Sequence, residues 1–267
     1  MKRLLGLKLN WRKTMATTRM KETMTVWERA QVAAKLSAIA YMNPKPADTA
    51  CKKLGFASGK IISNDGAEVL IAKDRNDLWF AFRGTEPSKL NDVLADLKVI
   101  KNTAKAGGKV HGGFQEEVDD VWMDIVKELD HNDQLKVRKD VYFTGHSLGA
   151  AMATIATTRY TPEELFTFGS PRVGGKHFIK NIKADHYRFM NNNDIVCRIP
   201  PAWLGFRHHG QMIYFNRFGD KQLKPTWSDT FYGIINSWKR FKFFDGVVDH
   251  GMPNYVKAIK KLAKEDT

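Results

Sequence analysis

Cysteine is scarce in this chain of 267 residues, which contains only Cys51 and Cys197. Two cysteines so far apart form neither a metal-binding spacing nor a disulfide framework, so two free thiols are the default and a single bridge is the alternative. Long apolar runs are also missing, because no stretch approaches the ~18 apolar residues of a membrane-spanning helix. The sequence therefore predicts no metal site, no organic cofactor and no transmembrane segment.

A recognisable secretory signal is also absent. The chain begins with positive charge, but Lys8 interrupts its apolar segment, which is shorter than the ~7–15 apolar residues of a signal core. We expect residues 1–22 to be a basic, weakly ordered extension and residues 23–267 to form one domain. Localisation stays open between the cytoplasm and export without a recognisable signal peptide.

Acidic residues are few relative to basic ones, with 29 Asp and Glu against 43 Lys and Arg and a formal net charge of +14. Such a balance favours anionic partners, namely nucleic acid, anionic lipid surfaces or acidic polymers. The alternative is a solvated basic surface that aids solubility. The hydrophobic content of 43% is typical of a globular protein and excludes a disordered one.

The most informative stretch runs from a β-branched and aromatic segment at 141–143, through Gly145, Ser147 and Gly149, into an alanine-rich segment. This is the G-x-S-x-G pattern between a strand and a helix. Ser147 is expected at the tip of a sharp bend, with glycines on either side because side chains there would collide. The pattern predicts a serine nucleophile; the alternative is a β-to-α turn with an incidental serine.

Apolar periodicity along the rest of the chain alternates between strands and helices. Strands are predicted at 61–63, 69–73, 78–82, 165–168, 187–190 and 212–215. Helices are predicted at about 25–42, 46–54, 89–109, 110–133 and 252–262, the first opened by a capping box of Thr25 and Glu28. This alternation predicts a single α/β domain, with a mostly parallel central sheet flanked by helices.

A serine nucleophile needs a histidine base and a carboxylate that orients it, and in this topology they follow in the order acid, then histidine. Asp194 follows the strand at 187–190, and His250 precedes the last helix, so both fit. The rival candidates are His208, His209, Asp185, Asp245 and Asp249. His111 and His146 precede the nucleophile in the chain and are expected to line the substrate pocket.

Six ordered motifs between about residues 25 and 260 give the sequence a family resemblance. They are Phe82–Thr85, Val110–Phe114, Thr144–Ala150, Thr167–Gly174, Asn193–Val196 with Ile199–Pro201, and His250 with Tyr255. With these motifs the chain resembles the class 3 lipases, the fungal-lipase-like branch of the α/β-hydrolases.

The resemblance implies a serine carboxylic-ester hydrolase that forms an acyl-enzyme on Ser147, with Asp194 as the acid and His250 as the base. It also implies an oxyanion hole formed by Thr85 and Leu148, and a helical lid at about 87–108. A lipase acting on acylglycerols or related lipid esters is expected, and a phospholipase, a feruloyl-type esterase or a polyester esterase of the same fold is the alternative.

The implied partners are a lipid or ester substrate and a transient contact with an anionic lipid interface. The distant alternative is a basic protein on a hydrolase fold that binds nucleic acid or an anionic membrane. Because the sequence has no recognised nucleic-acid motif, we expect no nucleic acid partner.

Overall fold

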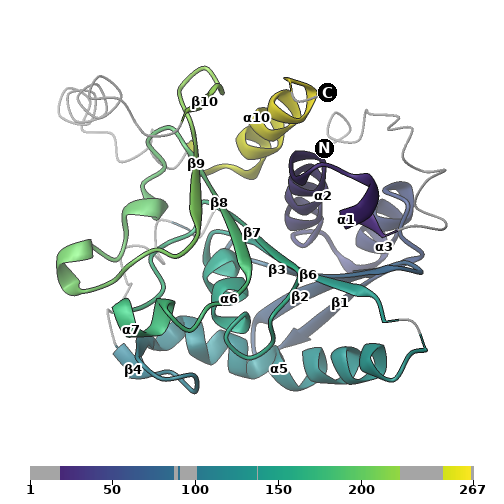
Figure 1. The fold of residues 1–267 in the computed structure, drawn as a ribbon, viewed down its shortest axis with the longest axis horizontal. Helices are drawn as coiled ribbons and strands as arrows, with labels where there is room; N and C mark the ends of the chain where they lie inside the picture. The colour runs from purple at the N-terminus through teal and green to yellow at the C-terminus, as the bar shows by residue number, and fades with distance from the viewer. Residues whose placement is uncertain (1–18, 87–89, 91–100, 137, 223–248, 266–267) are drawn as a thin grey trace.

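The computed structural model describes residues 19–86, 90, 101–136, 138–222 and 249–265 (Figure 1). The helices are α1 (Met20–Thr23), α2 (Val26–Ile39), α3 (Pro44–Lys53), α5 (Gly112–Asp133), α6 (Leu148–Ala156), α7 (Lys176–Ile179) and α10 (Met252–Glu265), with short 3-10 helices η2 (Val196–Arg198) and η3 (Ala202–Leu204). The strands are β1 (Ser58–Asn64), β2 (Ala67–Lys73), β3 (Asp77–Phe82), β4 (Lys101–Thr103), β5 (Lys109–His111), β6 (Asp140–His146), β7 (Glu164–Phe168), β8 (Asp185–Asn191), β9 (Gln211–Phe215) and β10 (Lys221–Gln222).

A central sheet of eight described strands runs in the order β1-β2-β3-β6-β7-β8-β9-β10. The pairs from β3 to β9 are parallel, whereas β1, β2 and β10 join antiparallel at the two edges. The mostly parallel sheet predicted from the sequence is therefore confirmed. Because parallel strands end at the same edge, the loops after β3, β6, β7 and β8 all emerge there.

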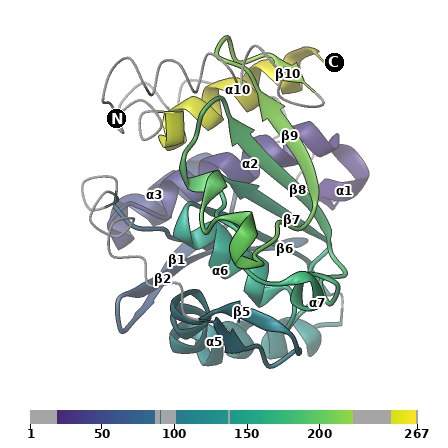
Figure 2. The same cartoon turned by 90° about the vertical axis from the view of Figure 1, so that its left-hand side faces the viewer.

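Helices cover both faces of the sheet, as Figure 2 shows. Trp79 and Ala81 of β3 pack on one face with α2, α3 and α10, and Phe80 and Phe82 pack on the other with α5 and α6. Every residue of β3 is buried, which explains the unbroken apolar run from Leu78 to Phe82, since a strand covered on both faces has no polar side.

The predicted capping box is present at the start of α2. The Thr25 side chain accepts from the Glu28 N–H, and the Glu28 carboxylate accepts from the Thr25 N–H at 2.8 Å. One turn later, the buried Arg29 makes a two-pronged ion pair with Glu164 of β7, both N–O distances being 2.6 Å. This pair fixes α2 across the strands that carry the site.

Two expectations about the chain differ from the structure. The sequence predicts a helix at 89–109, but the last part of this segment is not helical. Residues 101–103 and 109–111 form the antiparallel pair β4–β5 instead. Gly107 and Gly108 both have positive φ, at 87° and 82°, and close this hairpin. The remainder of the predicted lid, at 87–89 and 91–100, lies outside the described residues, and the lid stays a prediction.

The other difference concerns the N-terminal extension expected at 1–22. Residues 20–23 form α1, and the Met20 side chain is buried in the core. The Met20 N–H also donates to the Asp77 carboxylate. The folded part therefore includes the last residues of the stretch that we expected to be weakly ordered; residues 1–18 lie outside the described chain.

Candidate active site

Ser147 sits between β6 and α6 in a conformation that few residues adopt, with φ 59° and ψ −129°. The neighbouring glycines allow this bend. A Cβ on Gly145 would collide with the Gly149 carbonyl, and a Cβ on Gly149 would collide with the Phe82 carbonyl of β3. The strain is of the kind stored at functional sites, and it holds Ser147 at the carboxyl edge of the sheet, as the sequence predicts.

Asp194 and His250 form a buried pair. Nδ1 of His250 lies 2.8 Å from Oδ2 and 3.0 Å from Oδ1 of Asp194, although the two residues are 56 positions apart. Asp194 also accepts hydrogen bonds from the Val196 N–H, at 2.9 Å, and from the Tyr255 hydroxyl. With 0% and 2% of their surfaces exposed, neither Asp194 nor His250 is a solvated surface residue.

The environment of Asp194 keeps it ionised. Burial by itself would raise the pKa of this carboxyl, but attraction to His250 and the hydrogen bonds from His250 and Tyr255 outweigh it, so the pKa lies below its usual value. Because this acceptor is ionised, Nδ1 of His250 carries a proton and donates a hydrogen bond to Asp194. The lone pair on Nε2 is then available to take a proton, which is the arrangement that a general base requires.

The Nε2 atom of His250 is buried and makes no hydrogen bond to any described residue. The Ser147–His250 bond that a triad forms during reaction is therefore not made in this structure. Such bonds are often long before substrate binds. The loop after β7 lies against Ser147, Asp194 and His250. A Cβ on Gly169 would lie 2.7 Å from His250 Nδ1 and 2.8 Å from Asp194 Oδ2. The carbonyl of the preceding residue, Phe168, accepts a hydrogen bond from the Ser147 N–H at 3.0 Å.

The predicted oxyanion-hole residues lie on either side of Ser147. Leu148 is the first residue of α6, where the helix N-terminus offers free N–H groups. Thr85 follows Gly84, at which a Cβ would lie 3.1 Å from the Ser147 Cβ. Both positions are next to the serine, at the ends of the neighbouring strands β3 and β6.

His146 packs against His250, and both of its ring nitrogens bond within the protein. Its ring stacks on that of His250 with centroids 4.4 Å apart. Nε2 of His146 lies 2.7 Å from the backbone carbonyl of His250, and Nδ1 lies 2.8 Å from the Tyr41 hydroxyl. Because a carbonyl oxygen only accepts, Nε2 carries the proton and Tyr41 donates to Nδ1. Sequence reasoning expected His146 to bind substrate, but both of its nitrogens are already used within the protein.

Burial, together with repulsion from His250, lowers the pKa of His146 to about 3, so this ring stays neutral. Tyr41 is the residue of this candidate site that sequence reasoning missed, since it lies 105 positions before His146. Its only local signal is its place just after α2, the capped helix.

His111 and the rival residues have other surroundings. The His111 ring is 3% exposed and packs on Phe114, with centroids 4.0 Å apart, and against Phe206. Its predicted contact with substrate stays a prediction. His208 donates to the Cys197 carbonyl at 2.8 Å, and His209 contacts His186, so neither makes the bond to Asp194 that His250 makes. Of the rival carboxylates, Asp245 lies outside the described residues.

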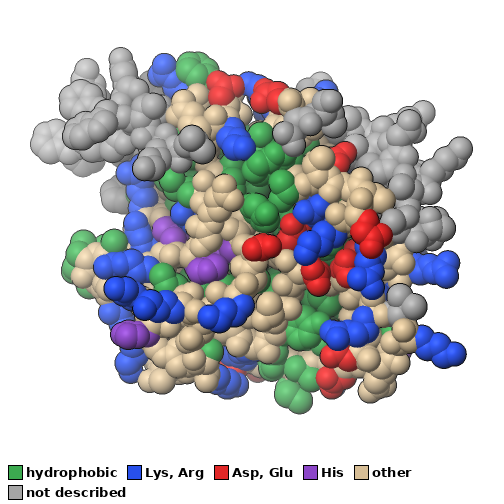
Figure 3. Space-filling model, in the orientation of Figure 1, with side chains coloured by type: hydrophobic (Ala, Val, Ile, Leu, Met, Phe, Trp, Pro, Cys, Tyr) green, Lys and Arg blue, Asp and Glu red, His purple; other side chains and the backbone are tan. Residues whose placement is uncertain are grey.

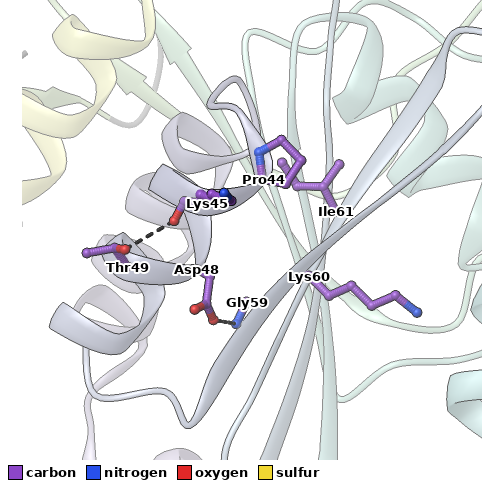
Figure 4. A pocket seen from close by; sticks show the side chains of 7 residues that line it. All are labelled: Pro44, Lys45, Asp48, Thr49, Gly59, Lys60 and Ile61. Atoms are coloured by element: carbon purple, nitrogen blue, oxygen red, sulfur yellow. Dashed lines mark hydrogen bonds between the residues drawn. The ribbon is translucent and has the colours of Figure 1, made fainter.

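A hollow of about 460 Å³ lies away from these residues, between α3 and β1 (Figure 4). Its polar groups bond within the protein: Asp48 accepts from the Gly59 N–H at 3.0 Å, and Thr49 donates to the Lys45 carbonyl at 3.1 Å. The hollow brings together none of the predicted site residues. In the part of the chain that the structure describes, no helix is long and apolar enough to cross a bilayer.

Comparison with known proteins shows what the chain is similar to. The family model of lipase (class 3) matches residues 79–203. A secreted mono- and diacylglycerol lipase of Malassezia restricta is 33% identical over 163 residues, which cover 54% of this chain and 52% of the relative. A lipase of Rhizomucor miehei is 33% identical over 184 residues, covering 63% of this chain and 50% of the relative. The chain thus spans about half the length of these curated relatives.

The fold has solved counterparts. The structure of the Rhizomucor miehei lipase propeptide complex superimposes with a TM-score of 0.63 and 26% identity, over 77% of this chain and 74% of that one. Another solved structure, in which a serine protease triad forms the catalytic centre of a triacylglycerol lipase, matches 85% of this chain with a TM-score of 0.63 and 23% identity. By its sequence motifs, its sheet and its strained serine, the chain is similar to the class 3 lipases, and it has the α/β-hydrolase fold.

Proposed function

We propose that the protein is a serine carboxylic-ester hydrolase that acts on acylglycerols or related lipid esters. The observation that carries the proposal is the buried pair of Asp194 and His250, which lies at the edge of the sheet that also carries Ser147. In this pair, Nε2 of His250 makes no hydrogen bond to any described residue. The relatives named above, which are a mono- and diacylglycerol lipase and a lipase, support the choice of substrate class.

In the proposed reaction, the hydroxyl oxygen of Ser147 attacks the ester carbonyl carbon while Nε2 of His250 takes the hydroxyl proton. The negative charge on the carbonyl oxygen is stabilised by the N–H groups of Thr85 and Leu148, and Asp194 stabilises the imidazolium. The imidazolium then protonates the departing alcohol, leaving an acyl group on Ser147. A water molecule, deprotonated by His250, attacks this ester, and the carboxylic acid is released as Ser147 regains its proton.

Replacing the nucleophile tests the proposal. Ser147→Ala should lower kcat for a soluble short-chain ester by about 10⁶-fold, the loss seen when a triad serine is removed. The measurement compares wild type, Ser147→Ala and a matched control, Ser63→Ala, on the exposed side of β1. An unchanged rate in the Ser147 variant would sink the proposal.

The substrate class is tested by comparing dioleoylglycerol and trioleoylglycerol emulsions with phospholipid vesicles and a feruloyl ester. Acylglycerols should give the largest kcat/KM, whereas a preference for phospholipid or feruloyl ester would assign the same residues to another esterase. We also propose that the protein makes transient contact with anionic lipid, which the net charge of +14 supports.

Export is part of the proposal, because several of the matching relatives are named as secreted. Immunodetection of the protein in culture medium and in lysed cells tests it. Retention of all the protein inside the cells would argue for the cytoplasm.

A further inference from the structure

Trp203 is the most exposed of the large hydrophobic side chains in the described part of the chain, with 82% of its surface in solvent. It lies in η3, within the segment that links β8 to β9, and its neighbours Ala202 and Leu204 are exposed and partly exposed. A tryptophan so placed adds nothing to the core. Its exposed ring is therefore available to a partner outside the fold.

Basic side chains from three parts of the chain hold this segment. Arg172 donates to the Pro200 carbonyl at 2.9 Å, and Arg207 donates to the Ala202 carbonyl at 2.6 Å. Lys101 of β4 donates to the Leu204 carbonyl. The position of Trp203 is therefore fixed by cations on the segment itself, on the loop after β7 and on the β4–β5 hairpin.

Two further cations lie close by. Arg198, an exposed residue of η2, donates to the Asn193 side chain at 3.3 Å. Lys176 follows Gly175, at which a Cβ would lie 3.7 Å from the Gly205 carbonyl, so the start of α7 borders the segment. We call the set of Trp203 with the five cations Lys101, Arg172, Lys176, Arg198 and Arg207 the Trp203 surface.

The charge of the Trp203 surface is not compensated. None of its five cations takes part in an ion pair between described residues, whereas Arg29, Lys73 and Arg159 elsewhere all pair with carboxylates. The oxygen atoms that these cations contact belong to carbonyls and an amide, which accept hydrogen bonds without neutralising charge. In Figure 3, Lys, Arg and His side chains gather on the left of the face, over α7 and the segment between β8 and β9, while Asp and Glu lie further right.

The surface is on the same edge of the sheet as the catalytic residues. Arg172 lies on the loop after β7, and Arg198 and Trp203 lie on the loop after β8, which also carries Asp194. Backbone bonds join these loops, since the Arg172 N–H donates to the Ile199 carbonyl at 2.7 Å and the Arg207 N–H donates to the Gly174 carbonyl at 2.8 Å. A flat partner that rests on Trp203 would therefore face the edge that holds Ser147.

We propose that the Trp203 surface docks the protein on anionic lipid, with Trp203 inserted at headgroup depth and the five cations beside lipid phosphates. Amphipathic tryptophan prefers this depth, and lysine and arginine are attracted to anionic headgroups. The inference rests on the proposed function in one respect only, namely that docking presents the edge with Ser147 to a lipid substrate. Lipid fits better than nucleic acid because the side chains beside Trp203, those of Ala202 and Leu204, are aliphatic. They offer no ring on which a nucleic-acid base could stack.

Binding is measured by co-sedimentation with vesicles of phosphatidylcholine containing about 30% phosphatidylglycerol, with pure phosphatidylcholine vesicles in parallel. All variants carry Ser147→Ala, so that binding is read without hydrolysis. Trp203→Ala should weaken binding to anionic vesicles at least about fivefold, and Lys176→Glu with Arg198→Glu at least about tenfold. Phe218→Ala is the matched aromatic control, because Phe218 is 68% exposed on a different turn. Lys45→Glu with Lys60→Glu, at the hollow beside β1, changes the net charge equally, and both controls should bind as the parent does.

Three outcomes would overturn the proposal. The first is that the Trp203 variant binds vesicles as well as the parent does, and the second is that the control variants lose as much binding. The third outcome is that the protein binds a DNA duplex but not vesicles, and that the same substitutions abolish the binding to DNA. Wild type and Trp203→Ala, both with Ser147 intact, should hydrolyse a soluble ester at the same rate. A failure of the proposed function appears in that soluble assay, and a failure of the docking surface appears only with vesicles.

Discussion

His146 connects His250, the proposed base, to the first helices of the fold. Its two ring nitrogens join the Tyr41 hydroxyl to the backbone of His250, and its ring supports that of His250 from below. Gly84, one residue before Thr85, lies against Tyr41, since a Cβ there would be 2.7 Å from the Tyr41 hydroxyl. We therefore expect Tyr41 to position both His250 and the predicted oxyanion loop, and to act on the reaction through these residues.

Tyr41→Phe removes the proton donor to His146 and leaves the ring in place. Losing one neutral hydrogen bond of this kind should lower kcat for a soluble ester about five- to tenfold, with KM little changed. Steady-state kinetics on a soluble ester measures both constants. Tyr187→Phe, which removes a hydroxyl from a partly buried ring outside the site, is the control. Equal kinetics for the two variants would show that Tyr41 has no positioning role.

At the scale of elements, α1 is held against the sheet through a carboxyl group that burial makes costly to ionise. The Met20 N–H donates to Asp77, at the start of β3. Burial, with repulsion from Asp74 as the next cause, raises the pKa of Asp77 to about 8. Between the ordinary pKa of aspartate and about 8, the folded chain therefore keeps a proton that the unfolded chain has lost.

This difference sets the sign of a pH effect on stability. Because Asp77 binds more protons in the folded state in that window, its contribution to the free energy of unfolding should fall as the pH rises from about 4 to about 8. Asp77→Asn, which can still accept from Met20, should weaken this fall and be more stable than wild type at pH 8. Urea unfolding at pH 5 and pH 8 measures it, with Asp65→Asn in the exposed β1–β2 turn as the control. A wild-type slope retained in the Asp77 variant would contradict the assignment.

At the scale of the whole molecule, parallel strands bring distant residues to one edge. Ser147, Asp194 and the residues before Thr85 each follow a different parallel strand, and the start of α10 adds His250 to the same edge. The net charge of +14 is also a property of the whole molecule, and it attracts anionic surfaces over a distance that salt shortens.

Salt should therefore weaken lipid binding without affecting the chemistry. Raising the ionic strength from about 0.1 M to about 1 M shortens the screening length from about 10 Å to about 3 Å. Binding to phosphatidylglycerol-containing vesicles should fall more than about tenfold, while hydrolysis of a neutral soluble ester changes little. Neutral phosphatidylcholine vesicles serve as the reference, and salt-independent binding to anionic vesicles would show that charge does not drive the contact.

The sequence by itself determined the parallel strands of the central sheet, the main helices and the resemblance to the class 3 lipases, because apolar periodicity, the capping box and the glycines around Ser147 are local signals. It also predicted Ser147, Asp194 and His250 as a set from their order in the chain. Only the tertiary structure decided that His250 meets Asp194, that His146 supports His250 instead of facing substrate, and that Tyr41 belongs to the site. The hairpin at 101–111 and the cations gathered around Trp203 were equally beyond the sequence. The physical reason is that all these contacts join residues far apart in the chain, and periodicity and spacing report only on neighbours.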